Sequence, residues 1–280
     1  MPSRQPDKES ARYATFPFLG GVDLLRATYV THSFSRHFHE GYAVGCIEHG
    51  AMRFRYQGES LVAAQGEVNL VVPGEAHDGH AASHEGWSYR MFYLPPQALR
   101  ESAKALTQSP GLPHFRAGVI RDPALAQCIR ATHRALENPT VPALEKETRL
   151  LWLLAHWISR HADTPGSWPD PPQEHRAVAL AREYLDARFA EDITLPGLAR
   201  AAGLSPFHLL RVFERQLGVT PHDYLTQIRV ERAREKLLTP ARLADVALET
   251  GFADQSHLTR TFKKRYGVTP GRFRKIVQNS

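Results

Sequence analysis

Alternating hydrophobic and polar positions characterise the first third of the chain. The clearest run is Ala51–Gln57, in which every second residue is apolar, and similar short runs cover Glu67–Val72 and Ser88–Leu94. A period of two places successive side chains on opposite faces of a strand, so each run predicts a half-buried strand. Gln57-Gly58 and Pro73-Gly74 predict turns between them. Short strands at this regular spacing predict a small β-sandwich or barrel.

The period becomes helical after the predicted strands. Asp122 followed by Pro123 is typical of a helix start, because aspartate caps free backbone N–H groups and proline fits the first helical position. A second helix is predicted over Ala143–Arg160, with an apolar stripe. Such a stripe predicts either core packing or the seam of a dimer. The region from Asp122 to Arg160 is therefore expected to mediate dimerisation or interdomain contact.

The last third of the chain contains an internal repeat. Leu209–Pro221 aligns with Leu258–Pro270 at an offset of 49, with leucine, arginine, phenylalanine, glycine, valine, threonine and proline in equivalent places. Upstream, Gly203 matches Gly251 at an offset of 48. Each copy reads as a helix, a glycine-containing turn and a second helix, which is the helix-turn-helix pattern.

A helical wheel predicts which side chains of the two second helices face a partner. In the first copy these are Phe207, Leu210, Arg211 and Glu214, and in the second they are Ser256, Thr259, Arg260 and Lys263, flanked by Gln255 and His257. Polar and basic side chains of this kind suit base edges and phosphates in the major groove of DNA. The apolar Phe207 and Leu210 are expected to meet thymine methyl groups or another protein surface.

Charge is distributed unevenly along the 280 residues. Residues 175–280 hold 18 Lys+Arg and 11 Asp+Glu, a net +7, whereas residues 1–174 hold 17 and 18, a net −1. A compact basic domain favours a polyanionic partner, most often nucleic acid. The composition, 42% hydrophobic and 23% charged, is that of a globular protein. With only Cys46 and Cys128 and no apolar leader or spanning segment, we expect a cytoplasmic protein without disulfides and without membrane contact.

Histidines gather in the β-rich part. Seven of the 15 lie between His32 and His84, and His37-Phe38-His39 would place two imidazoles on one face of a strand. With His77 after the Pro73-Gly74 turn, three imidazoles could converge on zinc, iron or manganese, or could simply line a polar surface. Neither a catalytic triad nor a pair of catalytic carboxylates can be assembled, so no catalytic residues are assigned.

The residues from about Glu174 to Lys275 closely resemble the AraC/XylS family of transcription regulators. The resemblance is carried by Gly251–Lys264 and by Gly267–Arg274. It implies that the second helices bind double-stranded DNA and that activation proceeds by contact with RNA polymerase. The residues implied in DNA binding are Phe207, His208, Leu210, Arg211, Gln255, Ser256, His257, Thr259 and Arg260, to which the wheel adds Lys263.

The first half is similar to the cupin-like sensor domain of the same family, through His37-Phe38-His39, Gly50, Gly66 and Pro73–His77. It departs from the metal-binding cupin pattern, because no glutamate follows His39 at the expected distance and the second motif has altered spacing. We therefore expect no metal and no cofactor, and a pocket for a small-molecule effector lined by His37, His39 and His77.

The expected fold class is α+β, with a cupin-like β-barrel or sandwich and its helices joined to an all-α domain with two helix-turn-helix motifs. The predicted boundaries are residues 1–161 for the sensor, 162–174 for a proline-rich linker and 175–280 for the DNA-binding domain. The predicted function is a sequence-specific, effector-responsive transcription regulator, and not an enzyme. The alternative is a cupin-type metalloenzyme whose helical domain recruits a partner protein.

Overall fold

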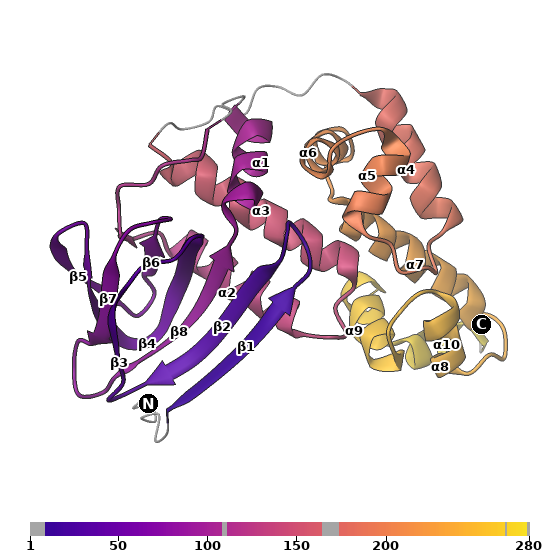
Figure 1. Cartoon of the computed structure of the whole chain (residues 1–280). Helices are drawn as coiled ribbons and strands as arrows, with labels where there is room; N and C mark the ends of the chain where they lie inside the picture. The colour runs from indigo at the N-terminus through magenta and orange to yellow at the C-terminus, as the bar shows by residue number, and fades with distance from the viewer. Residues whose placement is uncertain (1–8, 108–110, 164–173, 267, 279–280) are drawn as a thin grey trace. The chain divides into compact units, whose positions relative to one another are not determined.

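A computed structural model describes residues 9–107, 111–163, 174–266 and 268–278 (Figure 1). The chain divides into two compact units. The first comprises the described residues of 1–138 and 149–169, and the second those of 139–148 and 170–280. Residues 164–173 of the predicted linker, and Gly267 of the repeat, lie outside the described residues. None of the helices in the described ranges is long and apolar enough to cross a membrane.

The first unit is built on an antiparallel sheet structure, drawn in indigo to magenta in Figure 1. Its strands are β1 (Ser10–Phe16), β2 (Val22–Tyr29), β3 (Ser33–His37), β4 (Tyr42–Tyr56), β5 (Glu59–Ala64), β6 (Val68–Val71), β7 (His77–Ala81), β8 (Trp87–Leu94) and β9 (Val119–Ile120). The predicted strands at 51–57, 67–72 and 88–94 correspond to the end of β4, to β6 and to β8. Gln57 and Gly58 form the β4–β5 turn with positive φ angles of 48° and 83°.

The long strand β4 connects two parts of the sheet structure. Its first part pairs with β8 and β6, and its last part pairs with β5 and β7. Gly50 lies at the change, with φ at 67°. A Cβ atom at this position would lie 2.1 Å from the carbonyl oxygen of Gly86, so only glycine permits this close crossing of two backbone segments. This bend wraps the sheet around a core, as a cupin-like barrel requires.

Three further helices belong wholly or largely to the first unit: α1 (Pro96–Thr107), α2 (Pro123–Glu137) and α3 (Ala143–His161), of which residues 143–148 of α3 fall in the second unit. The Asp122 side chain accepts hydrogen bonds from the backbone N–H groups of Ala124 and Leu125, each at 3.0 Å, which confirms the predicted cap. The apolar stripe of α3 is fully buried, as shown by Leu151 and Leu154 at 0% exposure. That burial supports the core interpretation of the stripe.

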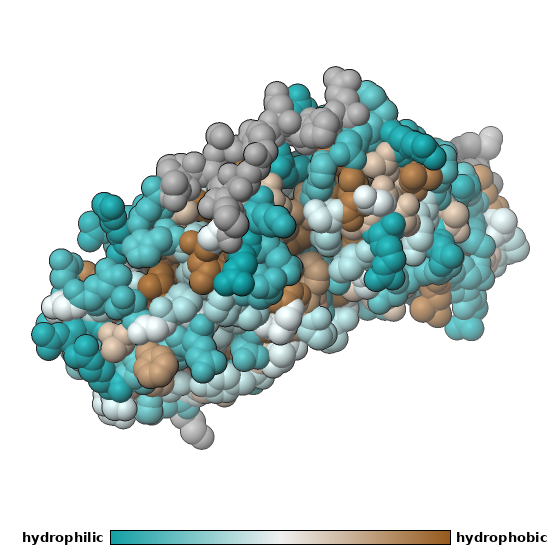
Figure 2. Space-filling model, turned by 45° about the horizontal axis from the view of Figure 1, so that its top comes forward, coloured by the Kyte–Doolittle hydropathy of each residue, from teal (hydrophilic) through white to brown (hydrophobic). Residues whose placement is uncertain are grey.

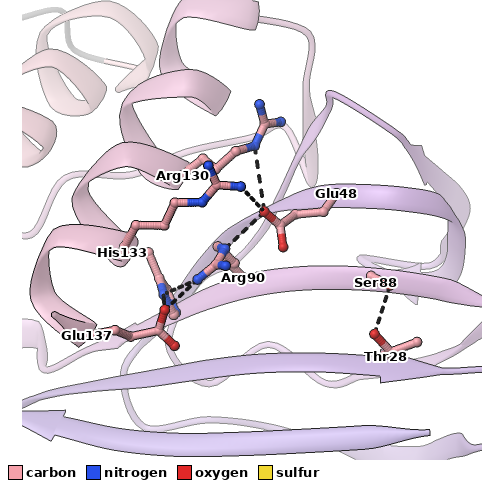
Figure 3. Close-up of polar contacts among 8 residues, drawn as sticks. Thr28, Glu48, Ser88, Arg90, Arg130, His133 and Glu137 are labelled. Carbon is pink, nitrogen blue, oxygen red and sulfur yellow. Dashed lines mark hydrogen bonds and ion pairs between the residues drawn. The ribbon is translucent and has the colours of Figure 1, made fainter. Parts of the chain in front are cut away.

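A buried ion-pair network joins α2 to the sheet (Figure 3). The Arg90 guanidinium of β8 donates to Glu48 of β4 at 2.9 Å and to Glu137 of α2 at 2.6 Å. It also donates to Nδ1 of the fully buried His133 at 3.1 Å. Arg90 is only 3% exposed, so these bonds replace the water that its charge gives up on burial. The network therefore fixes α2 in register with β4 and β8.

The second unit is helical and is drawn from orange to yellow in Figure 1. Its helices are α4 (His175–Ala187), α5 (Leu195–Ala202), α6 (Pro206–Leu217), α7 (Pro221–Leu237), α8 (Leu243–Glu249), α9 (Gln255–Tyr266) and α10 (Pro270–Gln278). The pairs α5–α6 and α8–α9 are the two predicted helix-turn-helix motifs. The α+β fold class is thus confirmed, with a cupin-like sheet domain and a helical domain.

Local capping chemistry sets these helix boundaries. Thr194, Ser205 and Thr220 each accept a backbone N–H from the first turn of α5, α6 and α7. Asp254 does the same for α9, where its carboxylate accepts the N–H of His257 at 2.6 Å. Gly203, at the end of α5, adopts the left-handed conformation with φ at 71°. The left-handed Gly203 agrees with the glycine-containing turn expected from the sequence, and the four side-chain caps satisfy backbone N–H groups at the helix starts.

Apolar side chains of the second repeat form one cluster. It joins the end of α7 to α8 and α9 and consists of Val230, Ala233, Leu237, Val246, Ala247, Phe252, Leu258 and Phe262. On the molecular face drawn in Figure 2, exposed apolar residues lie singly or in small groups among hydrophilic ones. The second helix-turn-helix motif is therefore held by apolar packing.

Candidate functional site

Helix α9 presents a polar and basic face to solvent. Leu258 and Phe262 are buried on one side of the helix, at 0% exposure. The exposed residues are Gln255, Ser256, Arg260, Lys263, Lys264 and Arg265, and His257 and Thr259 are half-buried. Ser256, Arg260 and Lys263 are therefore exposed, as the helical wheel places them, and their contact with DNA stays a prediction. An α-helix with such a face fits the major groove, where arginine can bond to guanine through two hydrogen bonds.

Helix α6 departs from the exposure predicted for it. Phe207 and Leu210 are buried, at 5% and 3% exposure, so the expectation that they project to solvent is wrong. At about 100° per residue, Leu210 lies only about 60° from the buried Phe213, and Phe207 lies a further 60° or so beyond Leu210. The buried stripe is therefore wide, consistent with a helix that contacts α4, α5 and α7. Arg211 and His208 lie at its margin and are half-buried.

Three exposed basic residues of α6 and α9 lie outside the sequence prediction: Arg215, Lys264 and Arg265. Arg215 lies on α6 beside the sector of Arg211, and Lys264 follows Lys263 on α9. All three are exposed and could reach a phosphate oxygen. A helical wheel drawn with the full width of the buried stripe of α6, and not only with the repeat alignment, places Arg215 on the outer side of that helix.

Three histidines of the first unit lie together, as the sequence suggested. His37 and His77 are paired opposite each other in the antiparallel β3–β7 ladder. The ring centroids are 4.3 Å apart for His37 and His77, and 4.9 Å apart for His39 with each of the other two. The prediction that His37 and His39 share one strand face needs correction, because β3 ends at His37 and its pairing with β7 is irregular after Phe34.

A backbone hydrogen bond brings His39 to the other two histidines. The N–H of Gly74 donates to the carbonyl oxygen of His39 at 2.9 Å, which holds the segment after β3 against the turn that precedes β7. The intervening Phe38 points outward and is 64% exposed. The cluster is thus built by a turn contact in addition to strand alternation.

The histidines line a cavity of about 50 Å³. Asn69, Tyr89 and Tyr93 contribute polar groups to its wall, and Met52 and Met91 contribute apolar ones. Burial, with His77 and His37 close by, lowers the pKa of His39 to about 4. Burial also lowers the pKa of His77 and raises the pKa values of Tyr89 and Tyr93. At neutral pH the cavity therefore offers the neutral imidazoles of His39 and His77 and two neutral phenols, which can bind a ligand through hydrogen bonds or a lone pair.

The fold and the two sites define a DNA-binding transcription regulator with a ligand-binding domain. Residues 19–154 match the AraC-like ligand binding domain, and residues 198–276 match a helix-turn-helix domain. An uncharacterized HTH-type transcriptional regulator of Bacillus subtilis, YbfI, is 32% identical over 239 residues, covering 85% of this chain and 86% of its own. The chain belongs to the AraC family of transcriptional regulators.

The chain is also similar to a second curated relative and to part of a solved structure. The arabinose operon regulatory protein of Escherichia coli is 25% identical over 241 residues, covering 84% of this chain and 80% of its own. The C-terminal domain of AraT, a response regulator from Geobacillus stearothermophilus, is 34% identical, covers 36% of this chain and 84% of that chain, and has a TM-score of 0.35. The relatives matched by sequence do not favour the alternative of a cupin-type metalloenzyme.

Proposed function

We propose that this regulator reads its operator mainly through α9 and that a small effector in the histidine-lined cavity controls this activity. The polar face of α9 carries the DNA-reading part of the proposal, because Ser256, Arg260 and Lys263 are exposed on a helix whose opposite side is locked in a core. A rigid helix with a free basic face is what major-groove readout requires. On α6, His208 and Arg211 are proposed as contacts at the margin of the DNA surface, whereas buried Phe207 and Leu210 are not exposed for that role.

Replacing Arg260 with alanine should weaken operator binding by about 1–3 kcal/mol and change the base preference, since a bidentate contact to a base is lost. Lys263→Ala is the matched control one turn along the same helix. Loss of a lysine that contacts phosphate should weaken DNA binding by less than loss of Arg260 and should affect all DNA sequences equally. Gel-shift titrations against operator and scrambled DNA measure both effects. Equal losses on the two DNAs for Arg260→Ala would contradict base readout by this residue.

Effector control requires a ligand that binds one functional state of the regulator better than another. A ligand with equal affinity for both states leaves their populations unchanged. A ligand of the cavity should raise the melting temperature of the full chain, and at 100 times its Kd it would stabilise the bound form by about 2.7 kcal/mol. A thermal-shift screen of small metabolites and ions, followed by gel shifts with each hit, tests this. The sensor role would be contradicted if stabilising ligands left operator affinity and transcription unchanged.

The family resemblance further suggests a cytoplasmic activator that contacts RNA polymerase and acts as a homodimer, and not as an enzyme. In vitro transcription with purified RNA polymerase, with and without the regulator, distinguishes activation from repression by the direction of the change in transcript. Sedimentation of the full chain, with and without operator DNA, reports its oligomeric state.

A further inference from the structure

The histidine cluster of the first unit has the compactness of a metal site. One ligand nitrogen from each of His37, His39 and His77 can be chosen so that all three lie within 4.8 Å of one another. Nitrogens that bind one zinc ion at about 2.0–2.1 Å are separated by roughly 3.3 Å in tetrahedral geometry. Displacements of the ring nitrogens by about an ångström therefore suffice to bring all three onto one ion.

Two of the imidazoles make backbone contacts that fix their tautomer. Nδ1 of His37 lies 2.7 Å from the carbonyl oxygen of Ser35, and Nδ1 of His77 lies 3.1 Å from that of Glu75. A carbonyl oxygen can only accept, so Nδ1 is the protonated nitrogen in each ring and Nε2 of a neutral ring keeps its lone pair. Donation from the second ring nitrogen to a backbone carbonyl is the arrangement that fixes the tautomer and orientation of metal-binding histidines.

An orphaned polar atom lies in the same cavity. Asn69 of β6 is 3% exposed and lines the cavity, and its Oδ1 atom has no hydrogen-bond partner. A buried acceptor without a partner is unfavourable, so its position calls for a donor from outside the chain. Water bound to a metal ion would be such a donor. A cavity of about 50 Å³ has room for an ion and a few water molecules.

We propose that His37, His39 and His77 bind one divalent transition-metal ion, of the zinc, iron, nickel and copper class that prefers imidazole ligands. Three protein ligands leave a coordination position open toward the cavity, where Asn69 lies. This proposal departs from the expectation of a metal-free pocket, which rested on the missing glutamate of the cupin pattern. The inference deepens the sensor function proposed above and rests on it for the regulatory consequence, whereas metal binding itself does not depend on that function.

Cobalt(II) is the probe, because its visible absorption reports the number and type of its ligands, and zinc(II) calorimetry supplies the stoichiometry. The full chain, stripped of metal with a chelator, should bind one ion per chain. His39→Gln should weaken binding by about 100-fold or more, since one of three ligands is lost. His80→Gln is the matched control: His80 lies on β7, as His77 does, but is exposed and outside the cluster.

The results separate this inference from the sensor function. Absence of cobalt absorption at submillimolar metal, or equal affinity in the full chain and in His39→Gln, would overturn the metal site. Loss in His39→Gln with retention in His80→Gln would support it. Gel shifts with and without zinc form an independent arm: metal binding without any change in operator affinity would leave the site standing and contradict metal sensing.

Discussion

Replacing Gly251 with alanine should destabilise the helical unit by about 3 kcal/mol or more and abolish operator binding at moderate temperature. Gly251, at the α8–α9 turn, has φ at +79°, which strains any residue with a Cβ atom. The added methyl carbon would lie 2.8 Å from the carbonyl oxygen of Phe189 and 2.8 Å from Nε of Arg229. It would therefore clash with the Phe189 backbone and disrupt the hydrogen bond that Arg229 donates to the Phe189 carbonyl oxygen.

That hydrogen bond joins the two halves of the helical unit. Arg229 of α7 is 5% exposed and donates to the carbonyl oxygens of Phe189 and Glu191, both at 2.7 Å, in the segment after α4. Burial lowers its pKa to about 10, so it stays charged at neutral pH. Displacing it would leave a buried charge and two carbonyl groups without partners, which adds to the steric cost.

Gly203→Ala is the matched control for this prediction, because Gly203 holds the equivalent place in the first repeat. Its φ is +71°, but no other atom lies within 4 Å of a Cβ built there. Only the conformational cost of about 1 kcal/mol should remain. Urea titrations followed by circular dichroism of the helices measure both variants. Equal losses at the two glycines would show that the close approach at Gly251 contributes nothing.

The parts of the fold that could be predicted from sequence are those fixed by local chemistry. Thr194, Ser205, Thr220 and Asp254 accept N–H groups within the next few residues, so their caps need no knowledge of distant chain. The repeat supplied an independent check, because two segments with one pattern adopt one structure. The exposure of Phe207 and Leu210 could not be settled in this way, since it depends on how many helices surround α6.

The histidine site shows where local patterns stop being informative. Alternation suggested that His37 and His39 are neighbours, but the β3–β7 register and the bond from Gly74 N–H to the His39 carbonyl create the three-histidine cluster. Both contacts join segments more than 30 positions apart in the chain. The orphaned Asn69, on a third strand, carries no sequence signal at all, because asparagine is common in many other settings.

Replacing Arg90 with methionine should cost about 3–5 kcal/mol of stability in the first unit, because one change breaks the buried pairs with both Glu48 and Glu137. Glu48 is 12% exposed, so its charge would stay largely buried. Burial opposes its ionisation, but the hydrogen bond and charge of Arg90, with Arg134 nearby, hold the pKa of Glu48 below its usual value. Its stabilising contribution is thus present at neutral pH and should fade as the pH falls below about 4.5.

Arg134→Met is the control for Arg90→Met, since Arg134 lies 3.4 Å from the same Glu48 oxygen but is 61% exposed. A pair so accessible to water should contribute less than about 1 kcal/mol. Urea unfolding followed by tryptophan fluorescence reports on the first unit through the buried Trp87 and Trp157. Adding Glu48→Gln to Arg90→Met should recover part of the loss, because it removes a buried charge whose remaining partners are Arg130 at 3.8 Å and the exposed Arg134. Without any recovery, the cost of Arg90→Met would have to come from its contacts with α2 and from packing, and not from the Glu48 pair.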